Sequence, residues 1–336
     1  MTSHASPPTS APAAPPAPPL ADGTTPAWRH HGGRLWSDYS AFVALVAVVL
    51  FAAITSPEFA TPQNLLNIVR QVSVIGIVAL GMTLVIIVGG IDLSVGAVLA
   101  LSGGAALWTL GMTEQPWLGV AAGLATGLAA GAVNGLLVTW GRLPSFIATL
   151  GMLAAARSLI LYIADGGSVT DSNEAYGNIA NSQWLGLATP IWVFGLTALV
   201  LHLVMKHAVF GRYVYAVGSN ERAARLSALP VARVKFAVYT LCSGLAALAA
   251  ILESSRLNSM SSANSGLAYE LDAIAAVIIG GTRMSGGRGK VIGTVIGVLI
   301  LGILNNALNL MNVSPYLQGM VKGLIIVLAV LVQKKD

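Results

Sequence analysis

Residues 205–235 read MKHAVFGRYVYAVGSNERAARLSALPVARVK and form the longest strongly charged interval of this chain. A long apolar segment precedes the interval and another follows it. Its only acidic residue is Glu221, and its six basic residues are Lys206, Arg212, Arg222, Arg225, Arg233 and Lys235. Basic loops between apolar segments stay on the cytoplasmic side of a membrane. The interval therefore predicts a polytopic membrane protein and sets its orientation.

The centre of this interval predicts a short helix. Residues 221–229 have helix-forming composition, and Pro230 ends the run. Such a helix would lie at the membrane surface and offer a docking site to a soluble partner. Charge alone is equally consistent with an ordinary solvated loop, so both interpretations stay open.

The composition indicates the class of protein. Of 336 residues, 55% are hydrophobic and only 9% are charged, and the mean hydropathy is +0.77. A soluble domain usually carries about 25% charged residues, so most of this surface is expected to face membrane lipid. The net charge of +5 follows from topology, and we expect no nucleic-acid partner. Cys242 is the only cysteine and the five histidines show no ligand spacing, so we expect no disulfide and no metal site.

Apolar runs predict about ten membrane segments, because a span needs roughly 20 apolar residues. The run at 268–281 is short and ends in Gly280-Gly281, so it could be a half-span packed among other helices. The expected fold is an all-α polytopic membrane protein with helix breaks at glycine-rich motifs. The segments are expected at residues 39–55, 67–88, 93–110, 117–140, 145–163, 190–205, 234–252, 268–281, 291–311 and 317–332.

The distribution of charge supports this number of segments. If the chain starts inside and the segments alternate, both termini are cytoplasmic and 14 of the 18 Lys and Arg residues fall inside. The outside loops then receive most of the acidic residues and a single base, Arg256.

Residues 1–38 are expected to form a separate cytoplasmic tail, and residues 39–336 the transmembrane domain. Residues 6–20 are nearly all Pro, Ala, Ser and Thr, so this tail cannot bury enough apolar surface to fold and should be disordered. It is not a secretory signal, because no charged region precedes an apolar region there.

Polar residues interrupt the apolar stretch from 72 to 110. The motif GGIDLSVG at 89–96 contains Gly89 and Gly90, which break a helix, and Asp92, which suits the cap of the helix that follows. The motif is either a tight cytoplasmic turn or a break at membrane depth that lines a cavity, as in transporters with discontinuous helices.

Four asparagines gather near the end of the ninth segment. Asn305, Asn309 and Asn312 lie at i, i+4 and i+7, so they share one helix face, and Asn306 lies beside them. Amides donate and accept hydrogen bonds, which suits a neutral polyhydroxylated solute, although hydrogen bonds between helices would explain them equally well. Arg70, Arg157 and Lys322 fall in the outer halves of their segments and could either snorkel to the surface or ring an outward vestibule.

Glycines recur every four residues in the fourth segment. Together they form a smooth stripe where a neighbouring helix can come close. The stripe suits either a static packing seam or a moving helix contact. Its members are Gly123, Gly127, Gly131 and Gly135.

The motif GTRMSGGRGK at 281–290 looks like a phosphate-binding loop but does not fit one. Met284 stands where the first glycine is needed, and Val291 replaces the hydroxyl residue that would hold magnesium. We therefore expect this chain to bind no ATP. Catalytic arrangements of Ser, His, Asp or Cys are also not apparent, so an enzyme is not expected.

Several motifs together resemble the permease subunits of bacterial ribose-type monosaccharide ABC importers. The resemblance runs from about Tyr39 to Val332. It rests on GGIDLSVG at 89–96, LPSFIATLGM at 143–152, FGRYVYAVGSN at 210–220, ERAARLS at 221–227 and GGTRMSGGRG at 280–289.

The resemblance implies a ten-segment permease of the bacterial inner membrane that pairs with a second permease copy around a central path. A cytoplasmic ABC ATPase would bind the ATP and drive it, and a periplasmic solute-binding protein would feed it. Ala228-Leu229 stands where relatives often have Gly-Ile. The sugar, and the choice between homodimer and heterodimer, stay open. An ion-coupled secondary carrier is the alternative, which the sparse intramembrane acids disfavour.

Functional residues follow from the resemblance and from the polar positions above. The cytoplasmic loop at 206–233 would carry the coupling residues Gly211, Arg212, Glu221, Arg222, Ala224, Arg225, Leu226 and Ser227. Candidate residues of the path are Asp92, Asn305, Asn306, Asn309, Arg157 and Lys322. Helix-break positions are Gly89, Gly90, Gly280 and Gly281.

Overall fold

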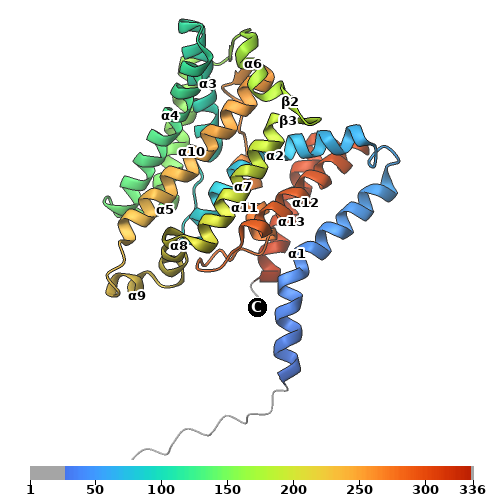
Figure 1. The fold of residues 1–336 in the computed structure, drawn as a ribbon, viewed down its shortest axis with the longest axis vertical. Helices are drawn as coiled ribbons and strands as arrows, with labels where there is room; N and C mark the ends of the chain where they lie inside the picture. The colour runs from blue at the N-terminus through green and yellow to red at the C-terminus, as the bar shows by residue number, and fades with distance from the viewer. Residues whose placement is uncertain (1–26, 334–336) are drawn as a thin grey trace, which may run out of the picture.

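The computed structural model describes residues 27–333 and is mostly helical (Figure 1). Ten helices correspond to the predicted segments: α1 (Ala27–Thr55), α2 (Pro62–Ile87), α3 (Val95–Thr113), α4 (Pro116–Thr139), α5 (Ser145–Ile163), α7 (Thr189–His207), α10 (Val231–Leu257), α11 (Tyr269–Ile279), α12 (Val291–Leu310) and α13 (Pro315–Gln333). Short elements join them: β1 (Ser168–Thr170), α6 (Glu174–Asn181), β2 (Gln183–Trp184), β3 (Leu187–Ala188), α8 (Val209–Ser219), α9 (Glu221–Leu226) and β4 (Ser259–Ser261).

Most helix bounds fall within a few residues of the prediction, and the first helix is the exception. α1 begins at Ala27 and not at residue 39, so the predicted boundary of the tail at residue 38 falls inside a helix. The prediction of disorder for residues 1–26 lies outside the described residues. The strands were not predicted, because each is only two or three residues long. β1 pairs with β4, and β2 pairs with β3, both antiparallel.

Seven helices within the described residues are long and apolar enough to cross a membrane, namely α2, α3, α4, α5, α7, α10 and α12. α11 has 11 residues, which at 1.5 Å per residue covers only about half of a bilayer core. This length agrees with the half-span that the short apolar run allowed.

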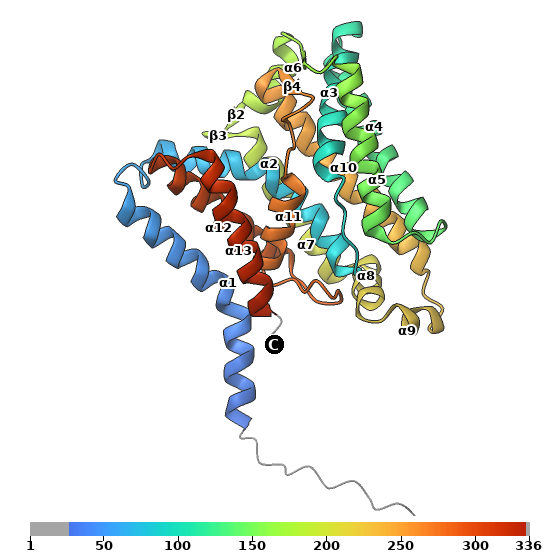
Figure 2. The same ribbon diagram turned by 180° about the vertical axis from the view of Figure 1, so that it is seen from behind.

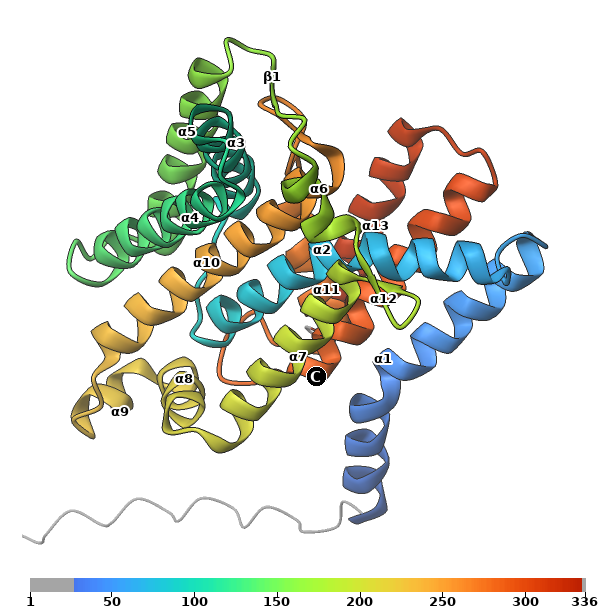
Figure 3. The same cartoon turned by 45° about the horizontal axis from the view of Figure 1, so that its top comes forward.

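α2 and α10 lie between two groups of helices. Figure 3 shows α3, α4 and α5 on one side and α1, α12 and α13 on the other, and Figure 2 shows the same division from behind. α2 is buried continuously from Gly76 to Ile87. Large apolar side chains such as Leu136, Phe146 and Leu199 are exposed on the outer helices, as expected where lipid covers the surface.

The glycine stripe of α4 forms the seam against α10 and α3. A Cβ added at Gly127 would overlap Ala247, and one at Gly131 would lie 2.7 Å from the Tyr239 carbonyl oxygen. Lipid is as apolar as a helix interior, so close packing of this kind holds membrane helices together. The predicted close approach of a neighbouring helix is therefore confirmed.

The polar elements divide between two ends of the bundle. Figure 1 shows α6, β2 and β3 at one end and α8 and α9 at the other. The basic interval and the mostly uncharged segment 164–188 consequently lie on opposite faces of the membrane domain.

Candidate functional site

The basic interval folds into two helices and not one. α8 was missed, and α9 ends at Leu226 and not at residue 229. The Asn220 side chain caps α9, since its Oδ1 accepts a hydrogen bond from Ala223 N at 3.0 Å. Beyond α9, Ala228 adopts a left-handed conformation with φ of 56°, which glycine adopts at lower cost. This conformation gives a physical reason for the glycine that the family resemblance leads us to expect there.

Glu221 ties α9 to the membrane domain. Its Oε1 accepts from Arg225 Nη2, four residues later on the same helix, at 2.6 Å, and its Oε2 accepts from Lys235 Nζ on α10 at 2.5 Å. Burial alone would raise the pKa of Glu221, but the hydrogen bonds and charges of Lys235 and Arg225 outweigh it and hold that pKa below its usual value. The carboxylate thus stays ionised and bridges two helices.

The remaining coupling candidates divide into buried and exposed residues. Ala224 is buried, and so is Gly211, where an added Cβ would overlap the Met205 carbonyl oxygen at the corner between α7 and α8. Leu226 is 90% exposed at the tip of α9. Arg222, Arg225 and Ser227, which are near Leu226 in sequence, are exposed and polar, and so is Arg212 on α8. An apolar centre within a polar rim is a common arrangement in docking surfaces, and Leu226 among these residues fits it.

Glycines join α8 to the end of α2 and to the loop at 281–290. Gly287 N donates to the Ile87 carbonyl oxygen at 2.8 Å, and Tyr215 Oη donates to the Gly289 carbonyl oxygen at 2.9 Å. A Cβ on Gly218 would overlap that same Ile87 oxygen. We call these contacts the glycine junction. The loop that resembled a phosphate-binding loop is therefore a packing element.

A helix ends at each of the two predicted helix-break motifs. α2 ends at Ile87 and α11 ends at Ile279, and Gly89 and Gly281 follow with φ of 80° and 87°. The partner glycines serve close packing. A Cβ on Gly90 would overlap the Tyr239 hydroxyl, and one on Gly280 would overlap the Gly293 carbonyl oxygen.

Asp92 lies in a connection between α2 and α3 that is longer than a tight turn and is drawn out in Figure 2. The residue is fully buried, and its Oδ1 accepts from Ser94 N at 2.9 Å and from Ser94 Oγ at 2.6 Å. Asn134 Nδ2 completes the cluster by donating to Ser94 Oγ at 2.9 Å. The N-cap position of α3 is Ser94, so the expectation that Asp92 caps this helix is wrong.

A cavity of about 180 Å³ lies among α2, α11, α12 and α13. Lys322 Nζ pairs with Asp272 Oδ2 at 3.0 Å on its wall. Asn305 Oδ1 is buried there and has no hydrogen-bond partner within the described residues. The other polar lining residues are Gln71 and Tyr269. A lysine, a carboxylate and amides in one small cavity supply both donors and acceptors, which is what hydroxyl groups require.

The other candidate residues of the path have partners within the protein. Asn306 exchanges two hydrogen bonds with Asn64, at 2.9 and 2.8 Å. Asn309 Oδ1 accepts from Gln318 Nε2 at 2.8 Å, and Arg157 Nη1 donates to the carbonyl oxygens of Ser262 and Ser265 at 2.8 and 3.0 Å. The prediction that Asn312 shares a helix face with Asn305 and Asn309 is wrong. α12 ends at Leu310, and Asn312 has a left-handed φ of 55°.

Sequence reasoning missed three lining residues of the cavity at Asn305, Gln71 on α2 and Tyr269 and Asp272 on α11. Asp272 gave the strongest signal, as an acid next to a short apolar run. Within residues 27–333, His, Cys, Asp and Glu form no group of three or more that could hold a metal ion.

The chain is similar to several permease proteins of sugar transport systems. The ribose import permease protein RbsC of Escherichia coli (strain K12) is 44% identical over 312 residues, covering 91% of this chain and 97% of the relative. RbsC of Bacillus subtilis (strain 168) is 44% identical over 309 residues, covering 91% and 96%. The L-arabinose transport system permease protein AraH of Escherichia coli (strain K12) is 38% identical over 299 residues, covering 89% and 91%.

No solved structure matches the chain. The model of one protein family, described as "Branched-chain amino acid transport system / permease component", matches residues 64–330. This match and the relatives confirm the resemblance drawn from the sequence motifs, and the apolar helices agree with a multi-pass membrane protein. The chain therefore belongs to the permease-component family of branched-chain amino acid transport systems.

Proposed function

We propose that this chain is the membrane-spanning permease subunit of an ATP-driven importer for a monosaccharide or a similar small polyhydroxylated solute. The similarity to ribose and L-arabinose permeases supports the substrate class. The observation that carries the proposal is the cavity at Asn305, whose buried amide oxygen has no hydrogen-bond partner in the described part of the chain and lies beside the Lys322–Asp272 ion pair. A sugar hydroxyl donates the hydrogen bond that this oxygen lacks.

The partners follow from the two ends of the bundle. A cytoplasmic ATPase would bind ATP and dock on α8 and α9, and a periplasmic solute-binding protein would release solute at the end that carries α6. Two permease copies would form the complete path in the bacterial inner membrane. Ten membrane segments with both termini cytoplasmic agree with the charge distribution.

Reconstitution tests the class of transporter. Vesicles containing the permease with its ATPase should accumulate a pentose or hexose only when ATP is inside and loaded binding protein is outside. Uptake that follows an imposed proton or sodium gradient without ATP would favour the secondary carrier instead.

Replacing Asn305 by leucine should lower uptake about tenfold, because a hydrogen bond to solute contributes roughly 1.5 kcal/mol. Assembly and thermal stability should be unchanged, since Asn305 Oδ1 bonds to no group of the described protein. The matched control is Asn306→Leu, which breaks the pair with Asn64 and should lower stability first. Wild-type uptake by Asn305→Leu would remove this amide from the path.

Cysteine labelling tests the orientation. In a Cys242→Ala background, a membrane-impermeant maleimide should label Ser172→Cys from outside and Ala223→Cys from inside. Both positions are exposed, and neither side chain caps a helix, unlike Asn173, whose Oδ1 accepts from Tyr176 N. Labelling of both positions from one side would contradict the predicted number of spans.

A further inference from the structure

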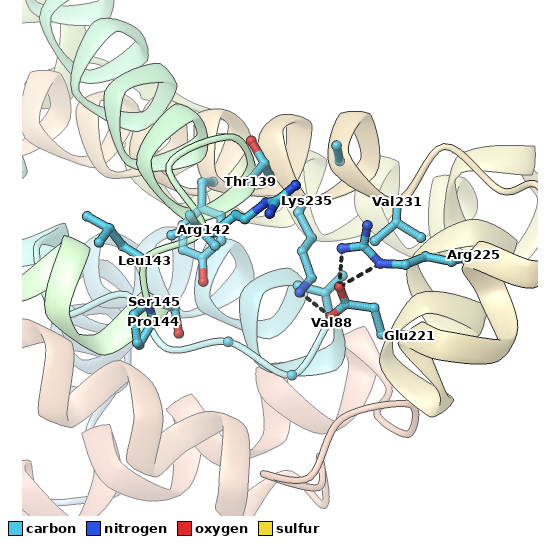
Figure 4. A pocket seen from close by; sticks show the side chains of 15 residues that line it. Val88, Thr139, Arg142, Leu143, Pro144, Ser145, Glu221, Arg225, Val231 and Lys235 are labelled. Atoms are coloured by element: carbon cyan, nitrogen blue, oxygen red, sulfur yellow. Dashed lines mark hydrogen bonds and ion pairs between the residues drawn. The ribbon is translucent and has the colours of Figure 1, made fainter.

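A second cavity, of about 370 Å³, lies at the end of the bundle that carries α9. Its walls come from the start of the connection after α2, the connection from α4 to α5, and the facing sides of α9 and α10. Nothing proposed above for solute transport uses it. Figure 4 shows Arg142 reaching into this space from one side and Lys235 and Arg225 from the other.

The charges around this cavity are unbalanced. Arg142, Arg225 and Lys235 contribute three positive charges, and Glu221 contributes the only negative charge among the lining residues. Glu221 is already shared between Arg225 and Lys235. Arg142 forms no ion pair within the described residues. The lining residues thus carry a net charge of +2 around an open cavity. The positive charges on its two sides repel each other unless an anion lies between them.

The unused hydrogen-bond donors match a tetrahedral anion. The Arg142 guanidinium donates no hydrogen bond to any described residue, so its five N–H groups are available, and Lys235 uses one of its three ammonium hydrogens on Glu221. Arginine forks and lysine ammonium groups are the side chains that bind phosphate oxygens most strongly. A carboxylate would satisfy fewer of these donors than a phosphate group with three free oxygens.

We propose that this cavity binds a phosphate-bearing anion, whose oxygens bridge Arg142 to Lys235 and Arg225. The anion is either a soluble phosphate ester of the cytoplasm or the headgroup of an anionic lipid, which basic residues attract at the cytoplasmic surface. In both cases it ties α9 to the connection from α4 to α5, and so fixes the coupling surface on the membrane domain. Binding of the anion therefore stabilises the fold, because a ligand of the native state raises the free energy of unfolding.

Thermal unfolding of the full-length permease, purified in a neutral detergent and stripped of lipid, tests the proposal. Glycerol 3-phosphate should raise the Tm by a few degrees relative to glycerol with sodium chloride at the same ionic strength. The Arg142→Gln variant should lose this rise. Gln tolerates the left-handed φ of 55° at this position no worse than arginine, so the backbone strain is unchanged. The matched control is Arg233→Gln, which removes an exposed charge on α10 that does not line the cavity and should keep the rise.

Nanodiscs distinguish the two sources of phosphate. If a lipid headgroup is the ligand, phosphatidylglycerol should raise the Tm over phosphatidylcholine in wild type and in Arg233→Gln but not in Arg142→Gln, and glycerol 3-phosphate should act weakly. If a soluble ester is the ligand, the rise in Tm caused by glycerol 3-phosphate in detergent should be larger than the rise caused by phosphatidylglycerol in nanodiscs. The proposal is overturned if neither arm changes the Tm, or if Arg142→Gln responds as wild type does in both.

Discussion

Uptake should disappear when Leu226 is replaced by aspartate, while the permease still inserts and folds. Leu226 is 90% exposed at the tip of α9, so the substitution removes little packing from the membrane domain. In the complex, a docked ATPase would cover this side chain, and the new carboxylate would be desolvated without a partner. That cost is on the order of a few kcal/mol, which weakens the contact by roughly a hundredfold or more.

Co-purification of the ATPase with the permease measures this effect directly, together with ATP hydrolysis stimulated by loaded binding protein. The matched control is Leu185→Asp, because Leu185 is 92% exposed at the opposite end of the bundle. Leu185 has a left-handed φ of 52°, which aspartate tolerates better than leucine. The control should bind the ATPase as wild type does. Full uptake and intact stimulation by Leu226→Asp would exclude α9 as the coupling element.

The long helices could be predicted from the sequence because each leaves a local signal. α5 was predicted at residues 145–163, which are its bounds in the structure. Pro116 and Pro190 open α4 and α7, and Gly89 follows the end of α2, so the residues that bound these helices act within one turn. The start of α1 was missed because residues 27–38 are too polar to show in hydropathy, although the helix continues through them.

The sites depend on contacts between distant residues, which periodicity does not report. Lys235 was counted as one base of a loop, but its partner is Glu221, fourteen residues earlier. The amides of α12 differ in their contacts. Asn306 forms hydrogen bonds with Asn64, whereas Asn305 lines the cavity. α8 was missed because its apolar and polar residues mix within a basic interval that was interpreted as a loop.

A second large effect is expected at the glycine junction. Gly218 sits on α8 against the end of α2, and a Cβ there would overlap the Ile87 carbonyl oxygen and lie 2.7 Å from Gly287 N. The obstacle is backbone, which cannot rotate away as a side chain can. Gly218→Ala must therefore push α8 off α2 and strain the hydrogen bonds from Gly287 N to Ile87 and from Tyr215 to Gly289.

We expect Gly218→Ala to destabilise this contact by roughly 1–3 kcal/mol, as overpacking of a tight interface does. Because Leu226 and the rest of α9 are untouched, the ATPase should still bind. Movement of the ATPase would no longer be transmitted through α8 to α2. Uptake should therefore fall sharply while ATP hydrolysis persists. This pattern separates the variant from Leu226→Asp, which loses the partner itself.

The control is Gly195→Ala on the preceding helix, α7, where an added Cβ meets nothing within 4 Å. Alanine is the better helix former by about 1 kcal/mol, so this variant should be neutral or slightly stabilised. The comparison of the two alanines isolates the backbone contact, since both change one helical glycine by a single methyl group. Wild-type uptake by Gly218→Ala would mean that α8 moves independently of α2, and that work from the ATPase enters the membrane domain through the Glu221–Lys235 ion pair instead.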